Sequence, residues 1–383
     1  MTGTTTTGGT RPTAFAADDL LVDSAERLFA TTCTFDAVQA AEGDGWAAAI
    51  WGAVADAGFA WIGLPGDAGG SGGTLLDAAE VVRIAGACAA PIPLAETALL
   101  GGWLLARGGL ELPDGPVTIV PDVAGDALVA NGADDGSLIL DGVAQRVPWA
   151  ADSDRIAAIV TVDGREVVAA IDPADVVIEP ATNLAGEPRP TVIVDAVRVP
   201  PERVAEIEAA TGDSGDDDAG GSLGEELELR GALSRVLLMA GALVSMSELT
   251  VGYTGERQQF GRPVGRFQAV QQHLVWGAQD AAIVDMASRV AAGRASAVGP
   301  LGARFEIAAA RTVADEAAGT ATRLAHQAHG AMGMTQEYAL HHLSRRLWSW
   351  RREWSGPGRW SGRVGSMAER VGADGLYPLI SSQ

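Results

Sequence analysis

The chain has 383 residues, of which 47% are hydrophobic, 20% charged and 5% aromatic, a composition typical of globular proteins with two or three domains. The chain has 49 acidic and 27 basic residues, and its formal net charge of -22 argues against a surface that binds nucleic acid or an anionic membrane. All the basic residues are arginine, which excludes chemistry that needs a primary amine, such as a P-loop lysine or a pyridoxal Schiff base.

Cysteine usage and hydropathy point to a reducing, aqueous compartment. Cys33 and Cys88 lie in Ala-rich stretches without paired spacing, so they predict neither a disulfide framework nor a zinc site. No uninterrupted apolar run reaches the roughly 18 residues of a membrane span, and residues 1–10 lack the features of a signal peptide. We therefore expect a cytoplasmic protein.

The hydrophobic pattern changes twice along the chain. Residues 19–109 have apolar positions at helical spacing, whereas residues 112–204 contain short Val/Ile runs separated by Asp, Gly and Pro. Long Ala/Leu/Val stretches with few breakers follow from residue 223. The prediction is an α+β chain with a helical domain at 1–110, an antiparallel β domain at 111–210, an acidic linker at 211–222 and a helical domain, a four-helix bundle, at 223–383.

Two segments of the C-terminal region carry candidate binding chemistry. The run ERQQFGRPV at 256–264 interrupts a helix with Gly and Pro, and its arginines suit a phosphate or pyrophosphate. The run HQAHGAMGMT at 326–335 combines small residues, which let a ligand approach the main chain, with Gln327, which can donate and accept hydrogen bonds. Each alone also fits an ordinary surface salt bridge or a tight helical turn.

Together the two segments resemble the acyl-CoA dehydrogenase family, whose C-terminal domain carries an Arg-x-x-Phe-Gly-x-Pro corner and a later Gln-x-x-Gly-Gly-x-Gly loop. The runs GLPG at 63–66, GGSGG at 69–73 and PIPLAET at 91–97 are also similar to the helical N-terminal domain of that family. The resemblance covers essentially the whole chain, including the order of helical, β and helical domains.

The resemblance implies FAD, an acyl-CoA substrate, dehydrogenation between the α and β carbons, and an electron-transfer flavoprotein as acceptor. A Glu would remove the α-proton, which the thioester acidifies, and hydrogen bonds would stabilise the developing enolate. In this family the corner and the loop reach across a dimer to FAD held mainly by the neighbouring subunit. Carried over to this sequence, these contacts fall on Arg257, Gln259, Phe260, Gln268, Gln327, Gly330 and Ala331, the last replacing the second loop glycine.

The β region departs from the family pattern. The family's Thr-Glu-Pro and Trp-x-Thr or Trp-x-Ser segments, which cover the flavin ring, are replaced by VTIVPD at 117–122 and QRVPW at 145–149. Trp149 could take over the covering role, although a lone Trp beside a strand is more often part of a core. We therefore expect the residues that bind this chain's own flavin ring to be absent.

The position of the catalytic base also departs from the family pattern. The family's Tyr-Glu-Gly-Thr run corresponds to WRREWSG at 350–356, so Trp354 takes the Glu position and Glu353 lies one residue early. One residue turns a helical side chain by about 100 degrees, so Glu353 could act only if the helix ends before it; a salt bridge to a neighbouring arginine is the alternative. A second family position falls near Gly231, where the nearest carboxylate is Glu228.

No metal site is assigned. The five histidines have no supporting carboxylates at ligand spacing, and the adjacent His341 and His342 should face different ways on a helix.

The residues that serve a neighbour's FAD are present, whereas those that hold this chain's own flavin and perform its own chemistry are missing. This asymmetry predicts an auxiliary subunit of an α2β2 assembly of two homologous acyl-CoA dehydrogenase chains. By resemblance its substrate is a bulky CoA thioester, such as a shortened sterol side chain. Two alternatives stay open: a self-sufficient homotetrameric enzyme with Glu353 as base, and a flavin-free scaffold subunit.

Overall fold

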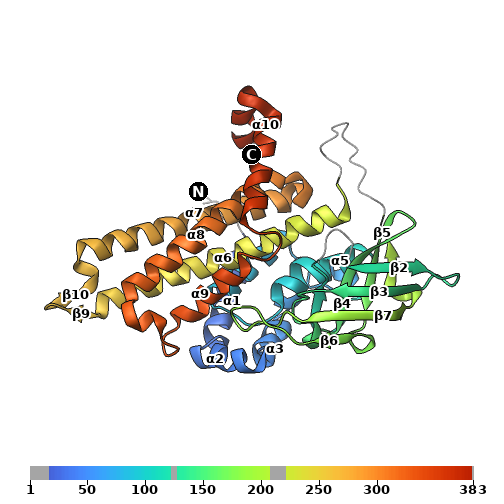
Figure 1. Ribbon diagram of the computed structural model, residues 1–383, viewed down its shortest axis with the longest axis horizontal. Coiled ribbons are helices and arrows are strands. Elements are labelled where there is room, and N and C mark those ends of the chain that lie inside the picture. The colour runs from blue at the N-terminus through green and yellow to red at the C-terminus, as the bar shows by residue number, and fades with distance from the viewer. Residues whose placement is uncertain (1–16, 122–126, 208–220, 382–383) are drawn as a thin grey trace, which may run out of the picture.

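The computed structural model describes residues 17–121, 127–207 and 221–381, and within them the predicted α+β architecture is confirmed (Figure 1). Helices come first, strands second and long helices third. The acidic run assigned to a linker lies largely outside the described residues, as do residues 1–10 and Asp122. Cys33 and Cys88 are free, half-buried thiols, and burial raises the pKa of Cys33 to about 12.

The N-terminal region is a set of short helices, of which α4 is buried along most of its length. Its α-helices are α1 (Asp19–Thr32), α2 (Phe35–Asp44), α3 (Ala48–Asp56), α4 (Leu75–Ala87) and α5 (Gly102–Arg107), and α5 follows directly on a π-helical turn at Glu96–Gly101. The N-terminus of α4 is fixed by a capping box, in which Thr74 and Asp77 each accept a hydrogen bond from the other's backbone amide. Glycines let α4 approach the C-terminal region: a Cβ on Gly241 would lie 2.0 Å from the carbonyl oxygen of Arg83.

The middle region consists of two four-stranded sheets with the orders β1-β4-β5-β8 and β2-β3-β7-β6. The strands are β1 (Val117–Ile119), β2 (Leu128–Gly132), β3 (Leu138–Ala144), β4 (Arg155–Val162), β5 (Arg165–Ile171), β6 (Val177–Glu179), β7 (Thr191–Val199) and β8 (Val204–Glu206). All pairings are antiparallel except that of β1 with β4, which is parallel and so differs from the expectation of a purely antiparallel domain. Between β1 and β4 the chain forms β2 and β3 of the other sheet, so it can enter β4 in the same direction as β1.

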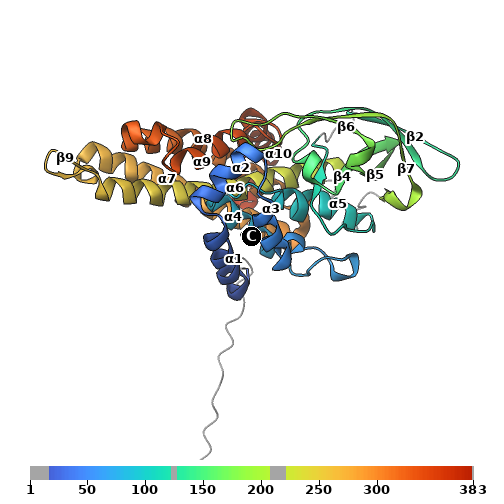
Figure 2. The ribbon, with the colours of Figure 1, turned by 90° about the horizontal axis from the view of Figure 1, so that it is seen from below.

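The C-terminal region is built on three long helices, α6 (Leu223–Glu256), α7 (Gln268–Gly302) and α8 (Arg304–His329), followed by α9 (Leu340–Trp350) and α10 (Pro357–Ser381). The short hairpin of β9 (Gln258–Gln259) and β10 (Arg262–Pro263) joins α6 to α7. Figures 1 and 2 both place this hairpin at one end of the molecule and the two sheets at the other. The ends of the bundle therefore face different surroundings.

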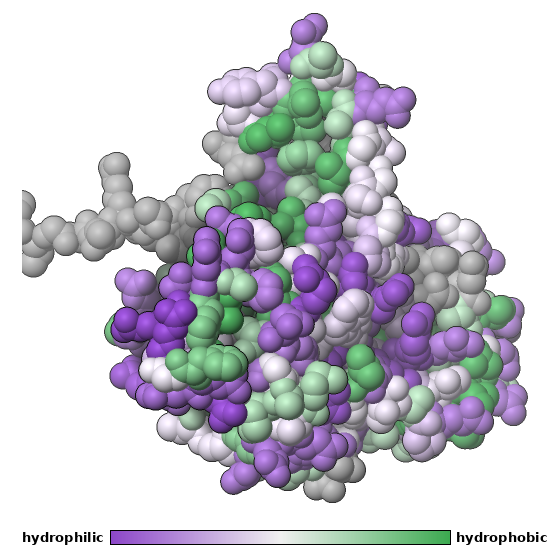
Figure 3. Space-filling model, turned by 60° about the vertical axis from the view of Figure 1, so that its left-hand side comes forward, coloured by the Kyte–Doolittle hydropathy of each residue, from purple (hydrophilic) through white to green (hydrophobic). Residues whose placement is uncertain are grey.

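Two features of the C-terminal helices stand out by hydropathy. Among the described helices, α6 alone is long and apolar enough to cross a membrane by length and composition. It packs in the core of the bundle, where Glu228 and Arg235 are buried in ion pairs. Helix α10 projects from the body and exposes apolar side chains, among them Leu376 and Tyr377 (Figure 3).

Candidate active-site cavity

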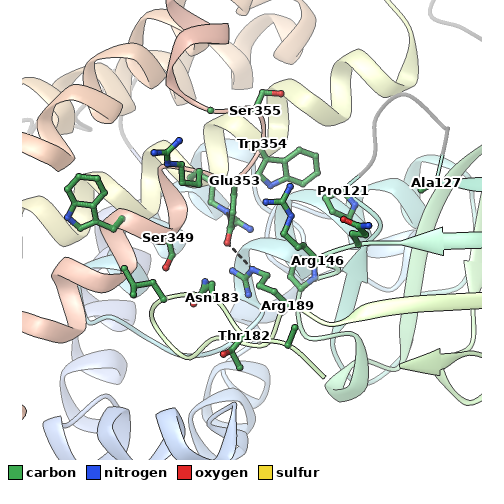
Figure 4. A pocket seen from close by; sticks show the side chains of 18 of the residues that line it. Pro121, Ala127, Arg146, Thr182, Asn183, Arg189, Ser349, Glu353, Trp354 and Ser355 are labelled. Atoms are coloured by element: carbon green, nitrogen blue, oxygen red, sulfur yellow. Dashed lines mark hydrogen bonds and ion pairs between the residues drawn. The ribbon is translucent and has the colours of Figure 1, made fainter. Parts of the chain in front are cut away.

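A cavity of about 1020 Å³ lies where the β domain meets the C-terminal helices (Figure 4). The β side contributes Pro121, Gln145, Arg146, Thr182, Asn183 and Arg189, and the helical side contributes Arg235, Trp348, Arg352, Glu353, Trp354 and Ser355. The cavity thus brings Gln145 of the β region together with Glu353 and Trp354. A cavity of this size, with apolar walls and convergent polar groups, is typical of an organic-ligand site.

Glu353 is fixed by two arginines instead of facing open space. Helix α9 ends at Trp350, so the helix does stop before Glu353, as a catalytic role required. The carboxylate then accepts hydrogen bonds from Arg189 Nε at 2.8 Å and Arg235 Nε at 2.6 Å, as Figure 4 shows for Arg189. Burial would raise the pKa of this carboxyl, but the two guanidinium groups outweigh burial and lower it to about 2. At neutral pH such a carboxylate is a poor proton acceptor.

The two positions that the resemblance assigns to a catalytic carboxylate, Trp354 and Gly231, lie in contact. Trp354 is buried in a left-handed backbone conformation, with φ of 55°, and its ring covers Gly231. A Cβ on Gly231 would lie 2.0 Å from Trp354 Cδ2, so no larger side chain fits there. The nearby Glu228 is buried and pairs with Arg359 and Arg363, and it accepts a hydrogen bond from Ser355 Oγ.

The ion pairs of Glu353 extend into a buried network that joins all three regions. Arg235 on α6 also pairs with Glu96 of the π-helical turn at 2.6 Å. On the β side, Arg189 pairs with Glu187 at 3.1 Å, and Glu187 pairs with Arg346 of α9 at 3.3 Å. Breaking such buried pairs leaves an uncompensated charge, so the network is expected to hold the regions in one arrangement.

The residues that replace the family's ring-covering segments make their contacts within the β domain. The hydroxyl of Thr118, in buried strand β1, donates a hydrogen bond to the carbonyl oxygen of Pro148. Trp149 is 3% exposed and does not line the cavity; the guanidinium of Arg189 lies 4.5 Å from the centroid of its ring. Of the two interpretations of Trp149, core packing fits the structure and flavin covering does not.

The residues assigned to a neighbour's FAD lie away from this cavity and are exposed. The corner supplies Arg257, Gln259, Phe260 and Gln268, and the end of α8 with its following turn supplies Gln327, Gly330 and Ala331. Phe260 is 90% exposed, and a Cβ on Gly330 would meet nothing within 4 Å. The corner contains the hairpin of β9 and β10, which Figure 1 places at one end of the bundle, the hairpin end.

An aromatic cluster that sequence reasoning missed brings the corner and the loop together. The ring of Tyr253, one helical turn before Arg257, stacks on His329 with centroids 4.5 Å apart, and Tyr338 contacts both rings. His329 directly precedes Gly330, so this stack ties the two segments to one another. The spacing of four residues between Tyr253 and Arg257 was the available signal, since it places both on one face of the helix.

His341 and His342, which were expected to face different ways, lie side by side. The rings of His341 and His342 lie with centroids 4.0 Å apart, and Glu42 of α2 joins them in a cluster that could hold a metal ion. His342 Nδ1 lies 2.7 Å from Glu42 Oε1. Arg345 and Arg346 also pair with Glu42, however, so cations already surround the carboxylate and disfavour a metal ion there.

Comparison with known proteins agrees with this architecture. The family model "Acyl-CoA dehydrogenase, C-terminal domain" matches residues 230–351. The chain is 28% identical over 286 residues to acyl-CoA dehydrogenase IpdE2 of Mycolicibacterium smegmatis, covering 74% of this chain and 76% of that protein, and 29% identical to IpdE2 of Mycobacterium tuberculosis over 74% and 75%. Residues 230–351 therefore match the C-terminal domain of the acyl-CoA dehydrogenase family, and the chain is similar to curated acyl-CoA dehydrogenases over about three quarters of its length.

Solved structures share this fold over nearly the whole chain. The ChsE4-ChsE5 complex from M. tuberculosis superposes with a TM-score of 0.80 at 21% identity, covering 92% of this chain and 98% of the other. A variant of the Tcur3481-Tcur3483 steroid acyl-CoA dehydrogenase gives 0.76 at 20% identity over 91% and 96%. The family is one of FAD-dependent flavoproteins, and the present chain carries its fold from the first helices to the bundle.

Proposed function

We propose that this chain is the auxiliary subunit of a heteromeric, FAD-dependent acyl-CoA dehydrogenase. It would contribute its hairpin end to FAD held by a homologous partner chain and would contain no catalytic base of its own. The observation that carries the proposal is the contact of Trp354 with Gly231, because an indole and a glycine fill both positions where the family places its carboxylate.

The state of Glu353 supports the same conclusion. It is the nearest carboxylate in sequence to the family position, but it is engaged by Arg189 and Arg235 and has its pKa lowered to about 2. A base for abstracting the α-proton of a thioester needs a pKa nearer to the working pH. The alternative of a self-sufficient enzyme that uses Glu353 is therefore disfavoured.

The chain's own cavity does not fit a flavin ring held by the usual family contacts, since Thr118 and Trp149 are turned into the β domain. The hairpin end does fit a contribution to a partner's FAD. There Arg257 is exposed, and Gly330 leaves its main chain open to close approach. FAD bound there supplies the acceptor for the β-hydride; this chain would fix its position, and the base would lie outside this chain.

The relatives support the finer parts of the proposal. One solved neighbour is a complex of two named chains and another is described as a steroid acyl-CoA dehydrogenase, so we propose a homologous partner in an α2β2 assembly and a bulky or steroid-derived CoA thioester. By the same family analogy the electron acceptor is an electron-transfer flavoprotein. The proposed site of action is the cytoplasm.

The test is to purify this chain alone and co-expressed with an acyl-CoA dehydrogenase homologue from its own locus, and to measure flavin absorbance and native mass. We expect a colourless lone chain and a yellow mixed tetramer with one FAD per unlike pair. A yellow homo-oligomer with one FAD per chain would instead support the self-sufficient enzyme.

A variant separates a cofactor role from a scaffold role. Arg257→Ala should weaken flavin retention in the mixed complex by about tenfold or more, the value of one charge-assisted hydrogen bond. Arg27→Ala, which removes an exposed arginine from α1, is the matched control and should leave flavin retention unchanged. Unchanged retention in the Arg257 variant would identify this chain as a flavin-free scaffold.

A further inference from the structure

The cavity is cationic in a strongly acidic chain. Four arginines and two glutamates line it, although the chain as a whole has a formal charge of -22. The charge of Glu353 is neutralised by Arg189 and Arg235, and that of Glu228 by arginines outside the cavity. The remaining positive charge belongs to Arg146 and Arg352.

These two arginines have no ion-pair partner among the residues that the structure describes. Arg146 reaches into the cavity from the β side (Figure 4), and Arg352, in the turn after α9, also lines the cavity. Asp315, the acid whose charge Arg352 influences, is already paired with Arg311 at 3.1 Å. Two unpaired guanidinium groups at one cavity attract an anion and can bind a carboxylate or phosphate through two parallel hydrogen bonds.

Part of the cavity wall has an unusual backbone conformation. Among the described residues, eight that are not glycine have positive φ, and three of these line the cavity: Arg146, Trp354 and Ser355. Such conformations persist only where the surroundings impose them, and they gather at binding and active sites. Dehydrogenation gives no reason for them here, because Trp354 and Gly231 leave no room for a base.

Apolar surface lies beside the two charges. Trp348 is 38% exposed and Leu184 is 63% exposed, and both line the cavity together with Trp354. A cavity of about 1020 Å³ is much larger than an inorganic ion needs. Its walls suit a ligand with an apolar or aromatic body and one anionic end.

We infer that this cavity is a binding site for an amphipathic organic acid, whose carboxylate pairs with Arg146 and Arg352 and whose body lies against Trp348 and Trp354. The ligand is bound without being oxidised, because Trp354 and Gly231 leave no room for a base. This inference rests on the proposal that the cavity holds no flavin of its own.

The test uses isothermal titration of the mixed complex with 2-naphthoate as probe and uncharged 2-naphthamide as its control ligand. We expect 2-naphthoate to bind with one site per copy of this chain and at least tenfold more tightly than the amide. The double variant Arg146→Met, Arg352→Met should lose at least tenfold in affinity for the acid and none for the amide. The variant Arg27→Met is the matched control and should bind as the parent does.

Three results would overturn the inference. They are no binding of the acid, equal binding of acid and amide, and unchanged affinity in the double variant. Flavin counting on the same sample keeps the two proposals apart. In the mixed complex, two FAD per unlike pair would refute the auxiliary role, whereas one FAD per unlike pair with no naphthoate binding would refute only the organic-acid site.

Discussion

Replacing Glu353 by Gln removes the negative charge between Arg189 and Arg235 while keeping the size of the side chain. The Glu353 side chain is 19% exposed and the two guanidinium groups are 1% and 5% exposed, so solvent can compensate little of the loss. The positive charges would then repel one another across the cavity floor.

The magnitude follows from the pKa. One pKa unit corresponds to about 1.36 kcal/mol, so a pKa lowered from 4.5 to about 2 corresponds to about 3 kcal/mol of stabilisation by the ionised carboxylate. Because the pKa is depressed in the folded state, this contribution is present above pH 4.5 and is lost as the pH falls from 4.5 towards 2. The difference in the free energy of unfolding between parent and variant should therefore be largest at neutral pH and vanish towards pH 2.

Urea denaturation followed by tryptophan fluorescence, repeated across this pH range, measures the difference. The exposed Glu202→Gln variant is the control and should change the free energy of unfolding by less than about 0.5 kcal/mol. In the mixed complex, the Glu353→Gln variant should still allow reduction of FAD by acyl-CoA. Undiminished stability together with lost flavin reduction would refute the reasoning and identify Glu353 as the base.

Packing yields further predictions. Gly231→Ala should destabilise the chain by about 1 to 3 kcal/mol, because its Cβ would lie 2.0 Å from the Trp354 ring. Adding Trp354→Ala should relieve this clash, and a double-mutant cycle in urea would detect the relief as non-additive free energies of unfolding. Gly241→Ala should lower the melting temperature, since its Cβ would lie 2.0 Å from a carbonyl oxygen of α4. Tyr253→Ala removes the stack on His329 and should weaken flavin retention in the mixed complex without changing its native mass, as absorbance after gel filtration would report.

Features encoded locally could be read from the sequence. The helical spacing around Trp46–Val54 and the short runs such as Val117–Val120 predicted the element types, and Gly261 and Gly330 marked two of the places where the bundle helices break. Such signals need only a few consecutive residues. The parallel pairing of β1 with β4 was missed because strand direction depends on the path of the whole chain.

The interior of the candidate site could not be predicted, because its contacts join residues far apart in the sequence. The sequence offered Trp354 and Gly231 as two separate positions that lack a carboxylate, and only the fold shows that one fills the space above the other. Likewise a salt bridge for Glu353 was expected from arginines beside it, whereas its partners are Arg189 of the β domain and Arg235 of α6. Local charge spacing says nothing about partners brought together by tertiary packing.

Arg189 and Arg235, which pair with Glu353, also join separate regions of the chain. Arg235 joins α6 to the π-helical turn through Glu96, and Arg189 joins the β domain to α9 through Glu187. A carboxylate at their meeting point must stay ionised to balance both, whereas a catalytic base must take up and release a proton in each turnover. One residue cannot satisfy both demands at neutral pH. Under the proposed function, Glu353 is therefore a structural residue, and the base for dehydrogenation comes from another chain.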